Sequence, residues 1–211
     1  MCGIVGYVGE RDCTDVLLDS LSKLEYRGYD SAGIAVFENG EITVEKAKGE
    51  LKNLREKVAE HKPMGHCGIG HTRWATHGEP SDINSHPHGN KRVSIVHNGI
   101  IENYKDIKNF LIEKGYTFIS ETDTETVAKL LDYYYEGDPV DAIIKTLKDV
   151  RGAYALGIVF KDFPDRIFAV RKDSPLIIGA GDEENFIASD VPAILKYTRN
   201  VYYIGNLEMA K

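Results

Sequence analysis

The chain opens with the stretch MCGIVG at residues 1–6, and the meaning of this stretch decides how the whole sequence is interpreted. Cys2 follows a single Met, so removal of Met1 would leave a thiol and a free α-amine on the same Cα atom. The thiolate is the nucleophilic form of cysteine, and an α-amine, with a pKa of about 7.7–8.0, can accept a proton near neutral pH. A nucleophile activated by its own N-terminal amine is a known catalytic arrangement. Taken alone, however, the stretch favours an ordinary cysteine in a buried strand.

The composition indicates a globular protein and argues against several functional classes. Hydrophobic residues make up 42% of the 211 residues and charged residues 28%, and no linker is evident, which predicts one domain over residues 1–211. The net charge is −7 and Lys and Arg form no cluster, which argues against nucleic-acid binding. No apolar run approaches the ~20 residues of a membrane span, and no signal peptide is recognisable.

The cysteines and histidines predict a reduced protein without a metal. The three cysteines, at positions 2, 13 and 67, form neither a disulfide framework nor a C-x-x-C pair. A cytoplasmic location fits best, and reduced thiols are what a cysteine nucleophile requires. The histidines at 71, 77, 86, 88 and 97 match no zinc spacing, so we predict no metal and no cofactor.

Hydrophobic periodicity predicts an α+β fold in which antiparallel sheets have helices packed on their outer faces. Asn39-Gly40 is a strong hairpin signal, and residues 75–90 form a long loop without periodicity. The predicted strands are 3–9, 34–37, 42–44, 67–74, 92–96, 117–119, 153–160, 167–171, 176–180, 186–189 and one near 202. The predicted helices are 12–24, 50–60, 103–114, 122–134 and 138–149, with a helical turn at 192–196.

Three polar clusters at predicted strand ends or loop tips could support catalysis at Cys2. Their sequences are HTRWATHG at 71–78, HNG at 97–99 and TDTE at 122–125. Acyl transfer needs hydrogen-bond donors for a developing oxyanion, and an Asn side chain followed by a Gly backbone N–H is such a pair. Arg73 offers a planar fork for a carboxylate, and Asp123 a counter-charge for an ammonium group. A carboxylate, an ammonium group and an amide to attack together describe glutamine.

Each cluster also has a simpler structural interpretation. Asn98-Gly99 is more often a tight turn at the end of a strand, and Asp123 is favoured at a helix start by the helix dipole. Arg73 could belong to a structural ion pair, and Trp74 could be part of the core.

Taken together with Cys2, the motifs resemble those of the class II glutamine amidotransferases, whose N-terminal cysteine is the nucleophile. Within that family, YRGYDSAG at 26–33 and SHPHGN at 85–90 resemble the glutaminase domain of the glutamine–fructose-6-phosphate aminotransferases. The resemblance covers essentially all of the 211 residues. The purine-pathway amidophosphoribosyltransferases share the general plan, but we expect them to differ from WAT at 74–76 and YDS at 29–31.

The resemblance implies an N-terminal-nucleophile fold, a four-layer αββα sandwich of two antiparallel sheets. It implies that Cys2 is the nucleophile and, through its α-amine, the base, and that Asn98 and Gly99 form the oxyanion hole. The loop from about 73 to 81 would close over the substrate. The implied glutamine-binding residues are Arg73 for the α-carboxylate, Asp123 for the α-amine, Thr76 and His77 in the pocket, and Trp74 at the ammonia exit.

The implied activity is hydrolysis of L-glutamine to glutamate and ammonia. In the full-length enzymes of this kind, a C-terminal phosphosugar isomerase domain uses the ammonia to convert fructose 6-phosphate into glucosamine 6-phosphate, and a homodimer is expected. Nothing in residues 1–211 resembles that isomerase region, so we expect a fragment or an isolated domain.

Two alternatives stay open at this point. A non-catalytic interaction module on the same fold would retain Met1, which blocks the amine. An enzyme with the same glutaminase chemistry could deliver ammonia to a different acceptor, as in purine synthesis. The intact mass tests the first alternative, and whatever follows Lys211 would decide the second.

Overall fold

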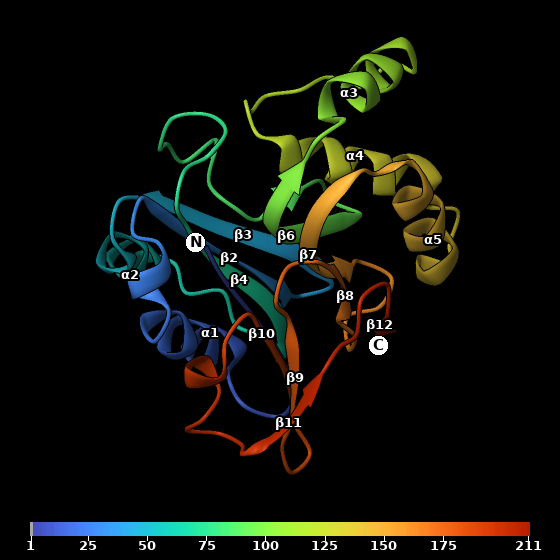
Figure 1. Cartoon of the computed structure of the whole chain (residues 1–211). Helices are drawn as coiled ribbons and strands as arrows, with labels where there is room; N and C mark the ends of the chain where they lie inside the picture. Colours follow the sequence, from blue (N-terminus) through green and yellow to red (C-terminus); the bar gives the residue numbers. More distant parts are fainter. Residues whose placement is uncertain (1) are drawn as a thin grey trace.

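The computed structural model describes residues 2–211 and consists of two antiparallel β-sheets that face each other. Figure 1 shows the sheets crossing the molecule with helices at either side. The seven-stranded sheet has the order β11-β9-β10-β1-β4-β2-β3, and the five-stranded sheet has the order β12-β8-β7-β6-β5. The strands of the first sheet are β1 (Gly3–Val8), β2 (Ser31–Glu38), β3 (Glu41–Lys48), β4 (Cys67–Arg73), β9 (Ile177–Ala180), β10 (Asn185–Ala188) and β11 (Asn200–Tyr203). The strands of the second are β5 (His88–Gly89), β6 (Val93–Ile101), β7 (Gly152–Phe160), β8 (Phe168–Lys172) and β12 (Met209–Ala210).

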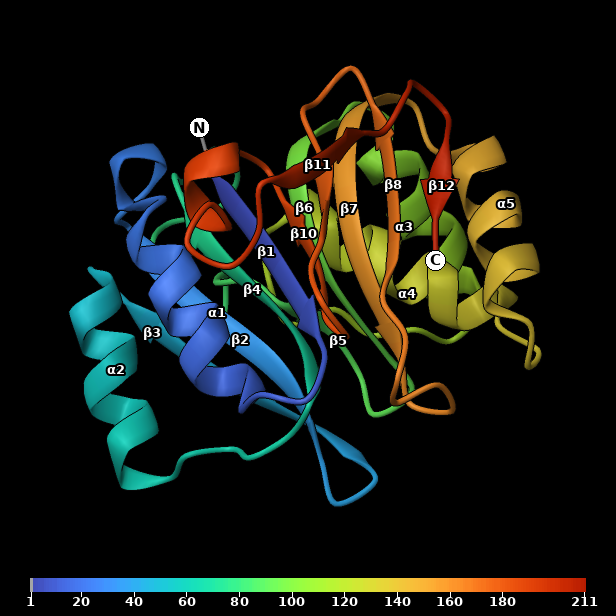
Figure 2. The same cartoon turned by 90° about the horizontal axis from the view of Figure 1, so that it is seen from below.

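Helices cover the outer face of each sheet, which gives four layers in the order α, β, β, α. Figure 2 shows α1 and α2 on the outer side of the seven-stranded sheet and α3, α4 and α5 beyond the five-stranded sheet. The helices are α1 (Cys13–Ser22), α2 (Leu51–Glu60), α3 (Tyr104–Glu113), α4 (Asp123–Tyr134) and α5 (Pro139–Asp149), with 3₁₀ turns η1 (Glu25–Arg27) and η2 (Val191–Ala193). The predicted α+β fold of two antiparallel sheets is confirmed.

Strand alternation explains how a chain of ordinary hydrophobicity fills three layers of core. In β1, Ile4 lies in the core between the two sheets, whereas its neighbours Val5 and Tyr7 lie in the core under the helices. Successive side chains of a strand point to opposite faces, so both faces of β1 are buried. The same alternation puts Ile69 of β4 and Val96 of β6 between the sheets. Other residues of β4 and β6 with the same parity therefore face the opposite sheet.

Local signals in the sequence correctly predicted several element boundaries. Asn39 and Gly40 both have positive φ, 50° and 81°, as a tight hairpin turn between β2 and β3 requires. Asp12 caps α1 by accepting from Thr14 N–H at 3.0 Å. Asp138 caps α5, which has Pro139 in its first turn.

One predicted strand is absent, and another is longer than predicted. Residues 117–119 form no strand, because the N–H of Ile119 donates to the Glu125 carboxylate instead of to a neighbouring strand. The strand predicted to stop at the HNG motif continues through Ile101 as β6. Asn98 and Gly99 are paired with Ala155 and Tyr154 of β7, so they lie within a sheet and are not a turn. The short strands β5 and β12 were not predicted.

No helix within residues 2–211 is both long enough and apolar enough to cross a bilayer.

Candidate active site

Every residue that we predicted for the site from the sequence lines one cavity, which has a volume of about 290 Å³. It is lined by residues from both sheets, from the loop after β4 and from the start of α4. The predicted lining residues are Cys2, Arg73, Trp74, Thr76, His77, Asn98, Gly99 and Asp123. Those not predicted are Arg27, His86, His97, Ile100, Thr122, Thr124, Ser174 and Pro175.

Pairing of β1 with β4 places Cys2 beside the end of β4. Gly3 is opposite Thr72 in the antiparallel register, so Cys2 lies next to the residues that follow β4. The Cys2 Sγ accepts from Trp74 N–H at 3.2 Å and lies 3.4 Å from Trp74 O. The backbone of Trp74 therefore contacts the sulfur atom, which the sequence did not indicate.

The surroundings of Cys2 favour the protonated thiol in the resting state. Burial raises the pKa of the Cys2 thiol, while the hydrogen bond from Trp74 N–H and the charge of Arg73 lower it. Burial is the largest of these effects, so the pKa lies above its ordinary value. A reaction at Cys2 near neutral pH then needs a base next to the sulfur. The α-amine that was predicted for this role exists only without Met1, which lies outside the described residues.

The side-chain amide of Asn98 lies against Cys2. Val96 faces the opposite sheet, and Asn98, two residues later on β6, faces the same way. Its Nδ2 donates to the backbone carbonyl of Cys2 at 2.9 Å. An amide NH₂ group has two hydrogens, so one remains for an oxyanion formed beside Sγ. Cys2 precedes β1 of one sheet and Asn98 belongs to β6 of the other. Because the two sheets face each other, these residues meet although they are 96 positions apart in the chain.

Gly99 occupies a backbone conformation that disfavours any side chain. Its φ is 129°, and a Cβ at this position would lie 2.0 Å from Ala153 O on β7. Only glycine therefore lets β6 approach β7 this closely next to the cavity.

Arg73 lies at the end of β4 and is almost completely buried. Its guanidinium donates to the carbonyls of His77, Gly78 (3.0 Å) and Glu79 (3.5 Å). These contacts tie the loop after β4 to the cavity wall. The positive charge of Arg73 lowers the pKa of the Cys2 thiol, and burial lowers the pKa of Arg73 itself.

Asp123 is the first residue of α4 and is buried. Its Oδ2 accepts from Ile101 N–H at 2.8 Å, and its Oδ1 has no hydrogen-bond partner within residues 2–211. The Oδ1 atom is therefore the one left for an ammonium ligand.

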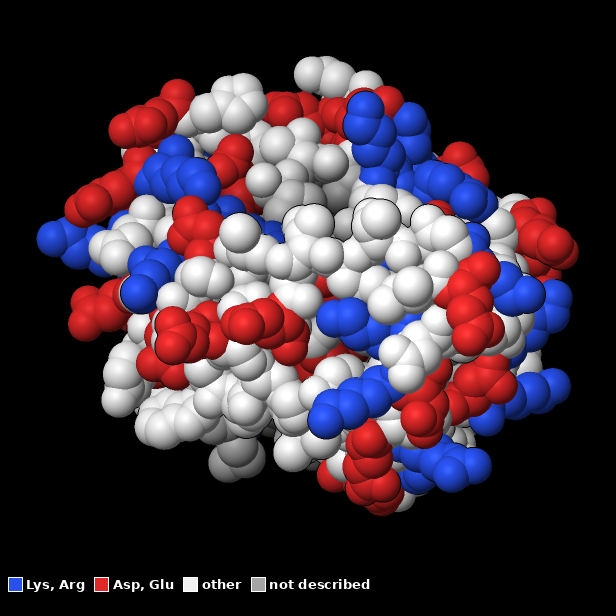
Figure 3. Space-filling model, turned by 90° about the horizontal axis from the view of Figure 1, so that it is seen from above, with Lys and Arg blue, Asp and Glu red and all other residues white. Residues whose placement is uncertain are grey.

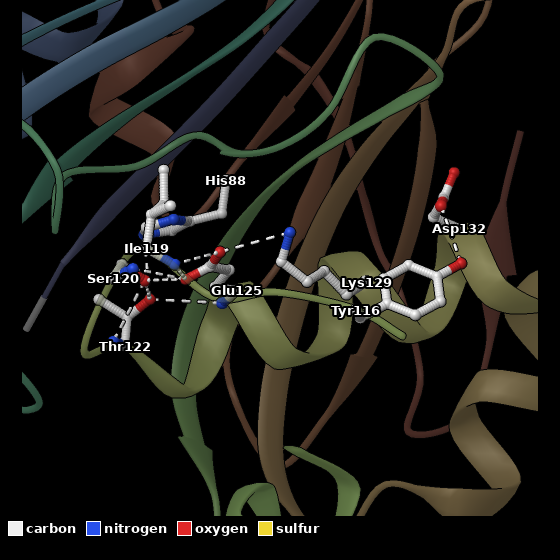
Figure 4. A network of polar contacts seen from close by, with 8 residues as sticks. All are labelled: His88, Tyr116, Ile119, Ser120, Thr122, Glu125, Lys129 and Asp132. Carbon is white, nitrogen blue, oxygen red and sulfur yellow. Dashed lines mark hydrogen bonds and ion pairs between the residues drawn. The ribbon is translucent and has the colours of Figure 1, made fainter. Parts of the chain in front are cut away.

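The segment before α4 is held in place by Glu125. The Glu125 carboxylate accepts from Ile119 N–H (3.1 Å), Ser120 N–H (2.7 Å) and Ser120 Oγ–H (2.7 Å), and it pairs with Lys129 at 3.5 Å (Figure 4). The Thr122 hydroxyl caps α4 by accepting from Glu125 N–H at 3.3 Å, which is one of the two hydrogen bonds of a capping box. In a complete capping box the Glu125 carboxylate would accept from the N–H of Thr122. Here it accepts instead from the N–H groups of Ile119 and Ser120, which precede the cap. This network places Asp123 at the cavity.

Glu125→Ala should lower the free energy of unfolding by about 3 kcal/mol, because buried N–H groups would lose a charged acceptor. Lys129→Ala is the matched control, since it removes the ion pair with the same carboxylate and the cation–π contact with Phe118 but leaves the N–H donors their acceptor, and it should cost about 1 kcal/mol. Urea denaturation followed by circular dichroism measures both. Equal losses in the two variants would contradict this account.

Trp74 presents its ring outward, although its backbone contacts Cys2. Trp74 is 46% exposed, and its ring meets that of Tyr29, a residue 53% exposed, edge-on at a centroid distance of 5.7 Å. Gly28 permits this arrangement, because a Cβ there would lie 2.6 Å from the carbonyl carbon of Arg73. The YRGYDSAG motif thus packs its backbone directly on the end of β4. The His77 ring contacts Tyr104 edge-on at 5.4 Å.

Some lining residues could have been found from the sequence and others could not. Arg27 belongs to the YRGYDSAG motif and pairs with Asp190. His86 belongs to the SHPHGN motif. Ser174 and Pro175 lie between β8 and β9 in a stretch without any motif, and only the fold brings them to the cavity.

Charges of both signs are mixed over the surface in Figure 3, and uncharged residues occupy the middle of that face. Within residues 2–211, no group of three or more His, Cys, Asp or Glu side chains is arranged to hold a metal ion. The three cysteines of this part of the chain are all free thiols.

Comparison with known proteins assigns this site to a family. Residues 71–196 match the family model described as a glutamine amidotransferase domain, which is more than half of the 211 residues. The chain is 62% identical over its whole length to the glutamine–fructose-6-phosphate aminotransferase [isomerizing] of Caldanaerobacter subterraneus subsp. tengcongensis. It is 54% identical over its whole length to the enzyme of the same name from Thermus thermophilus. The chain spans 35% of the length of each of these relatives, about a third.

Solved structures agree with the sequence comparison. The glutamine phosphoribosylpyrophosphate amidotransferase of B. subtilis, complexed with ADP and GMP, superposes with a TM-score of 0.86 over 99% of this chain and 46% of its own, at 26% identity. A structure described as the allosteric regulatory enzyme of purine biosynthesis gives 0.87 over the same shares of the two chains and at the same identity. Both have the fold of the N-terminal-nucleophile amidotransferases. The chain therefore belongs to the family of glutamine amidotransferase domains.

Proposed function

We propose that this chain hydrolyses L-glutamine to L-glutamate and ammonia, with Cys2 as nucleophile once Met1 has been removed. The observation that supports this best is the contact of Asn98 with Cys2. The Asn98 amide lies 2.9 Å from the carbonyl of the residue that bears the thiol, across two different sheets. A hydrogen-bond donor beside a partly buried thiol is the arrangement that acyl transfer needs.

The proposed reaction begins with the neutral thiol of Cys2. The free α-amine takes the thiol proton as Sγ attacks the side-chain carbonyl carbon of glutamine, which forms a C–S bond and an oxyanion. Asn98 Nδ2–H and Gly99 N–H donate to that oxyanion. The protonated α-amine then gives its proton to the departing nitrogen, and ammonia leaves a γ-glutamyl thioester. Water cleaves the thioester, which releases glutamate and restores the thiol.

The proposed substrate contacts use the two buried charges at the cavity. Arg73 binds the glutamine α-carboxylate and Asp123 Oδ1 its α-ammonium group, while Thr76 and His77 line the pocket and Trp74 stands at the ammonia exit. Because the guanidinium of Arg73 already donates to Gly78 and Glu79 carbonyls, binding of a carboxylate there would also act on the loop of residues 73–81. This supports the proposal that the loop closes over bound glutamine.

Asp123→Asn should raise the KM for glutamine by one to two orders of magnitude, on the order of 1.5–3 kcal/mol for a hydrogen bond to a charged group, and change kcat little. The ammonium group of the substrate loses its counter-charge, whereas the oxyanion donors are untouched. Steady-state glutaminase kinetics measure both constants. A fall in kcat with unchanged KM would place Asp123 elsewhere in the reaction.

The names of the relatives support a wider proposal for the whole protein. We propose that residues 1–211 form one glutaminase domain, and that a C-terminal phosphosugar isomerase domain transfers its ammonia to fructose 6-phosphate in a cytoplasmic homodimer. The 62% identity to an aminotransferase of that name, against 26% to the purine enzyme, favours this acceptor.

Mass spectrometry after treatment with 6-diazo-5-oxo-L-norleucine, a glutamine-like electrophile, tests the proposed function directly. We expect one adduct, on Cys2 of a chain that lacks Met1, and none on the buried Cys13 and Cys67. A native chain that retains Met1 and forms no adduct would instead support the non-catalytic module.

A further inference from the structure

Four buried histidines lie side by side at the candidate active site, where His86 and His97 line the cavity and the other two do not. They are His71, His86, His88 and His97, and none is more than 5% exposed. The rings of His71 and His86 stack at a centroid distance of 4.0 Å with an interplanar angle of 11°. His71 does not line the cavity, so it cannot contact a substrate there.

The hydrogen bonds of His71 determine its tautomer. Its Nε2 lies 3.0 Å from His97 O and 3.0 Å from Asn98 Oδ1. Both neighbours are carbonyl oxygens that can only accept, so Nε2 carries the hydrogen and donates to both. Burial lowers the pKa of His71 to about 3, so the ring is neutral and Nδ1 has no hydrogen. Nδ1 has no hydrogen-bond partner within residues 2–211.

This bond decides which end of the Asn98 carboxamide faces Cys2. Oδ1 accepts from His71, and Nδ2 donates to Cys2 O at 2.9 Å. Rotation of the carboxamide by 180° would put NH₂ against the N–H of His71 and Oδ1 against the Cys2 carbonyl. Both hydrogen bonds would then become repulsive contacts between like groups.

The ring of His71 is held rigidly enough for this role. Its backbone lies in the middle of the seven-stranded sheet, opposite Ile4 of β1 and Gly33 of β2. The His86 ring stacks on the His71 ring. The backbone of His86 in turn packs closely on β2, since a Cβ on Gly33 would lie only 2.1 Å from His86 O. The N–H of His97 donates to His86 Nδ1 at 3.3 Å, which fixes His86 in turn.

We propose that His71 is a positioning residue, which holds the Asn98 carboxamide with its N–H donors directed at the oxyanion formed next to Cys2. The inference rests on the proposed function, because the oxyanion belongs to that reaction. His71 acts only through Asn98 and transfers no proton itself.

Two substitutions of similar size separate the hydrogen bond from packing. Gln places an amide N–H near the position of the imidazole Nε2, whereas Leu fills the space without a donor. His71→Leu should lower kcat for glutamine hydrolysis about tenfold, the factor that one hydrogen bond contributes, with KM unchanged. His71→Gln should recover most of that loss. Equal kcat in the two variants would overturn the proposal.

Two further measurements exclude a merely structural effect. Alkylation of Cys2 by iodoacetamide forms no oxyanion, so its rate should be the same in His71→Leu as in the parent chain. In an Asn98→Ala background, His71→Leu should cause no further loss of kcat, because its only route of action is gone. Slower alkylation, or a further tenfold loss in the double variant, would show that His71 acts otherwise. His88→Leu is the control for a buried histidine of the same cluster, with lower stability expected but kcat retained.

Nitrogen-15 NMR of the histidine rings tests the proposal without activity. The parent chain should show His71 with a protonated Nε2 and a bare Nδ1 at neutral pH. The opposite tautomer would overturn the proposal even if all variants failed to fold. Absence of glutamine hydrolysis and of a norleucine adduct in the parent chain would refute the proposed function separately.

Discussion

A chain that keeps any residue ahead of Cys2 should lose about 10²–10⁴-fold in kcat for glutamine hydrolysis, the usual contribution of a general base. An amide nitrogen at residue 2 cannot accept a proton, and burial raises the pKa of the Cys2 thiol above its ordinary value. The thiol would then have no base near neutral pH. A non-cleavable N-terminal extension makes this variant without changing residues 2–211, and steady-state glutaminase assays measure it.

The matched control is the same chain with a cleavable extension, assayed before and after proteolytic removal. Activity should appear on cleavage, while the unfolding transition in urea stays the same. Full activity of the uncleaved chain would show that another group accepts the thiol proton.

Asn98→Ala should lower kcat by about 10²–10³-fold and leave the KM for glutamine nearly unchanged. The amide that contacts Cys2 is lost, so the oxyanion keeps only the backbone donor of Gly99. In the proposed site, ground-state binding depends on Arg73 and Asp123, which this substitution does not touch. Steady-state kinetics and adduct formation on Cys2 together separate chemistry from binding.

Asn103→Ala is a suitable control for this substitution. Its amide also bridges distant backbone groups, donating to Asp149 O at 2.8 Å and accepting from Arg151 N–H at 2.9 Å, but it does not line the cavity. It should keep wild-type kcat and lose some stability. A near wild-type kcat in Asn98→Ala would contradict the proposed oxyanion hole.

The structure also changes what the motifs mean. In the sequence, Asn98-Gly99 resembles a turn, yet both residues lie within β6 and are paired along β7. His71 of the HTRWATHG motif contacts Asn98 through its side chain, whereas Trp74 of the same motif contacts Cys2 through its backbone. One motif therefore supplies two kinds of contact, because His71 lies within β4 and uses its side chain, whereas Trp74 follows the end of β4 and uses its backbone.

The sequence alone determined the features that depend on near neighbours. The turn at Asn39-Gly40, the cap of α5 at Asp138 and the potential of Cys2 to combine thiol and amine are all local, so their residues identify them. The candidate residues of the site could be predicted for the same reason, since each motif brings its own chemical groups.

Only the tertiary structure decided how those groups meet. The continuation of β6, the tautomer of His71 and the place of Ser174 at the cavity depend on contacts between strands far apart in the chain. The register of one strand on another sets which face each side chain occupies, and a shift of one residue would reverse every face. The hydrophobic periodicity of a strand shows that its side chains alternate between two faces, but not which of the two faces packs against the other sheet. The packing of the two sheets decides which face of β6 meets the other sheet, and it thereby directs Asn98 toward Cys2.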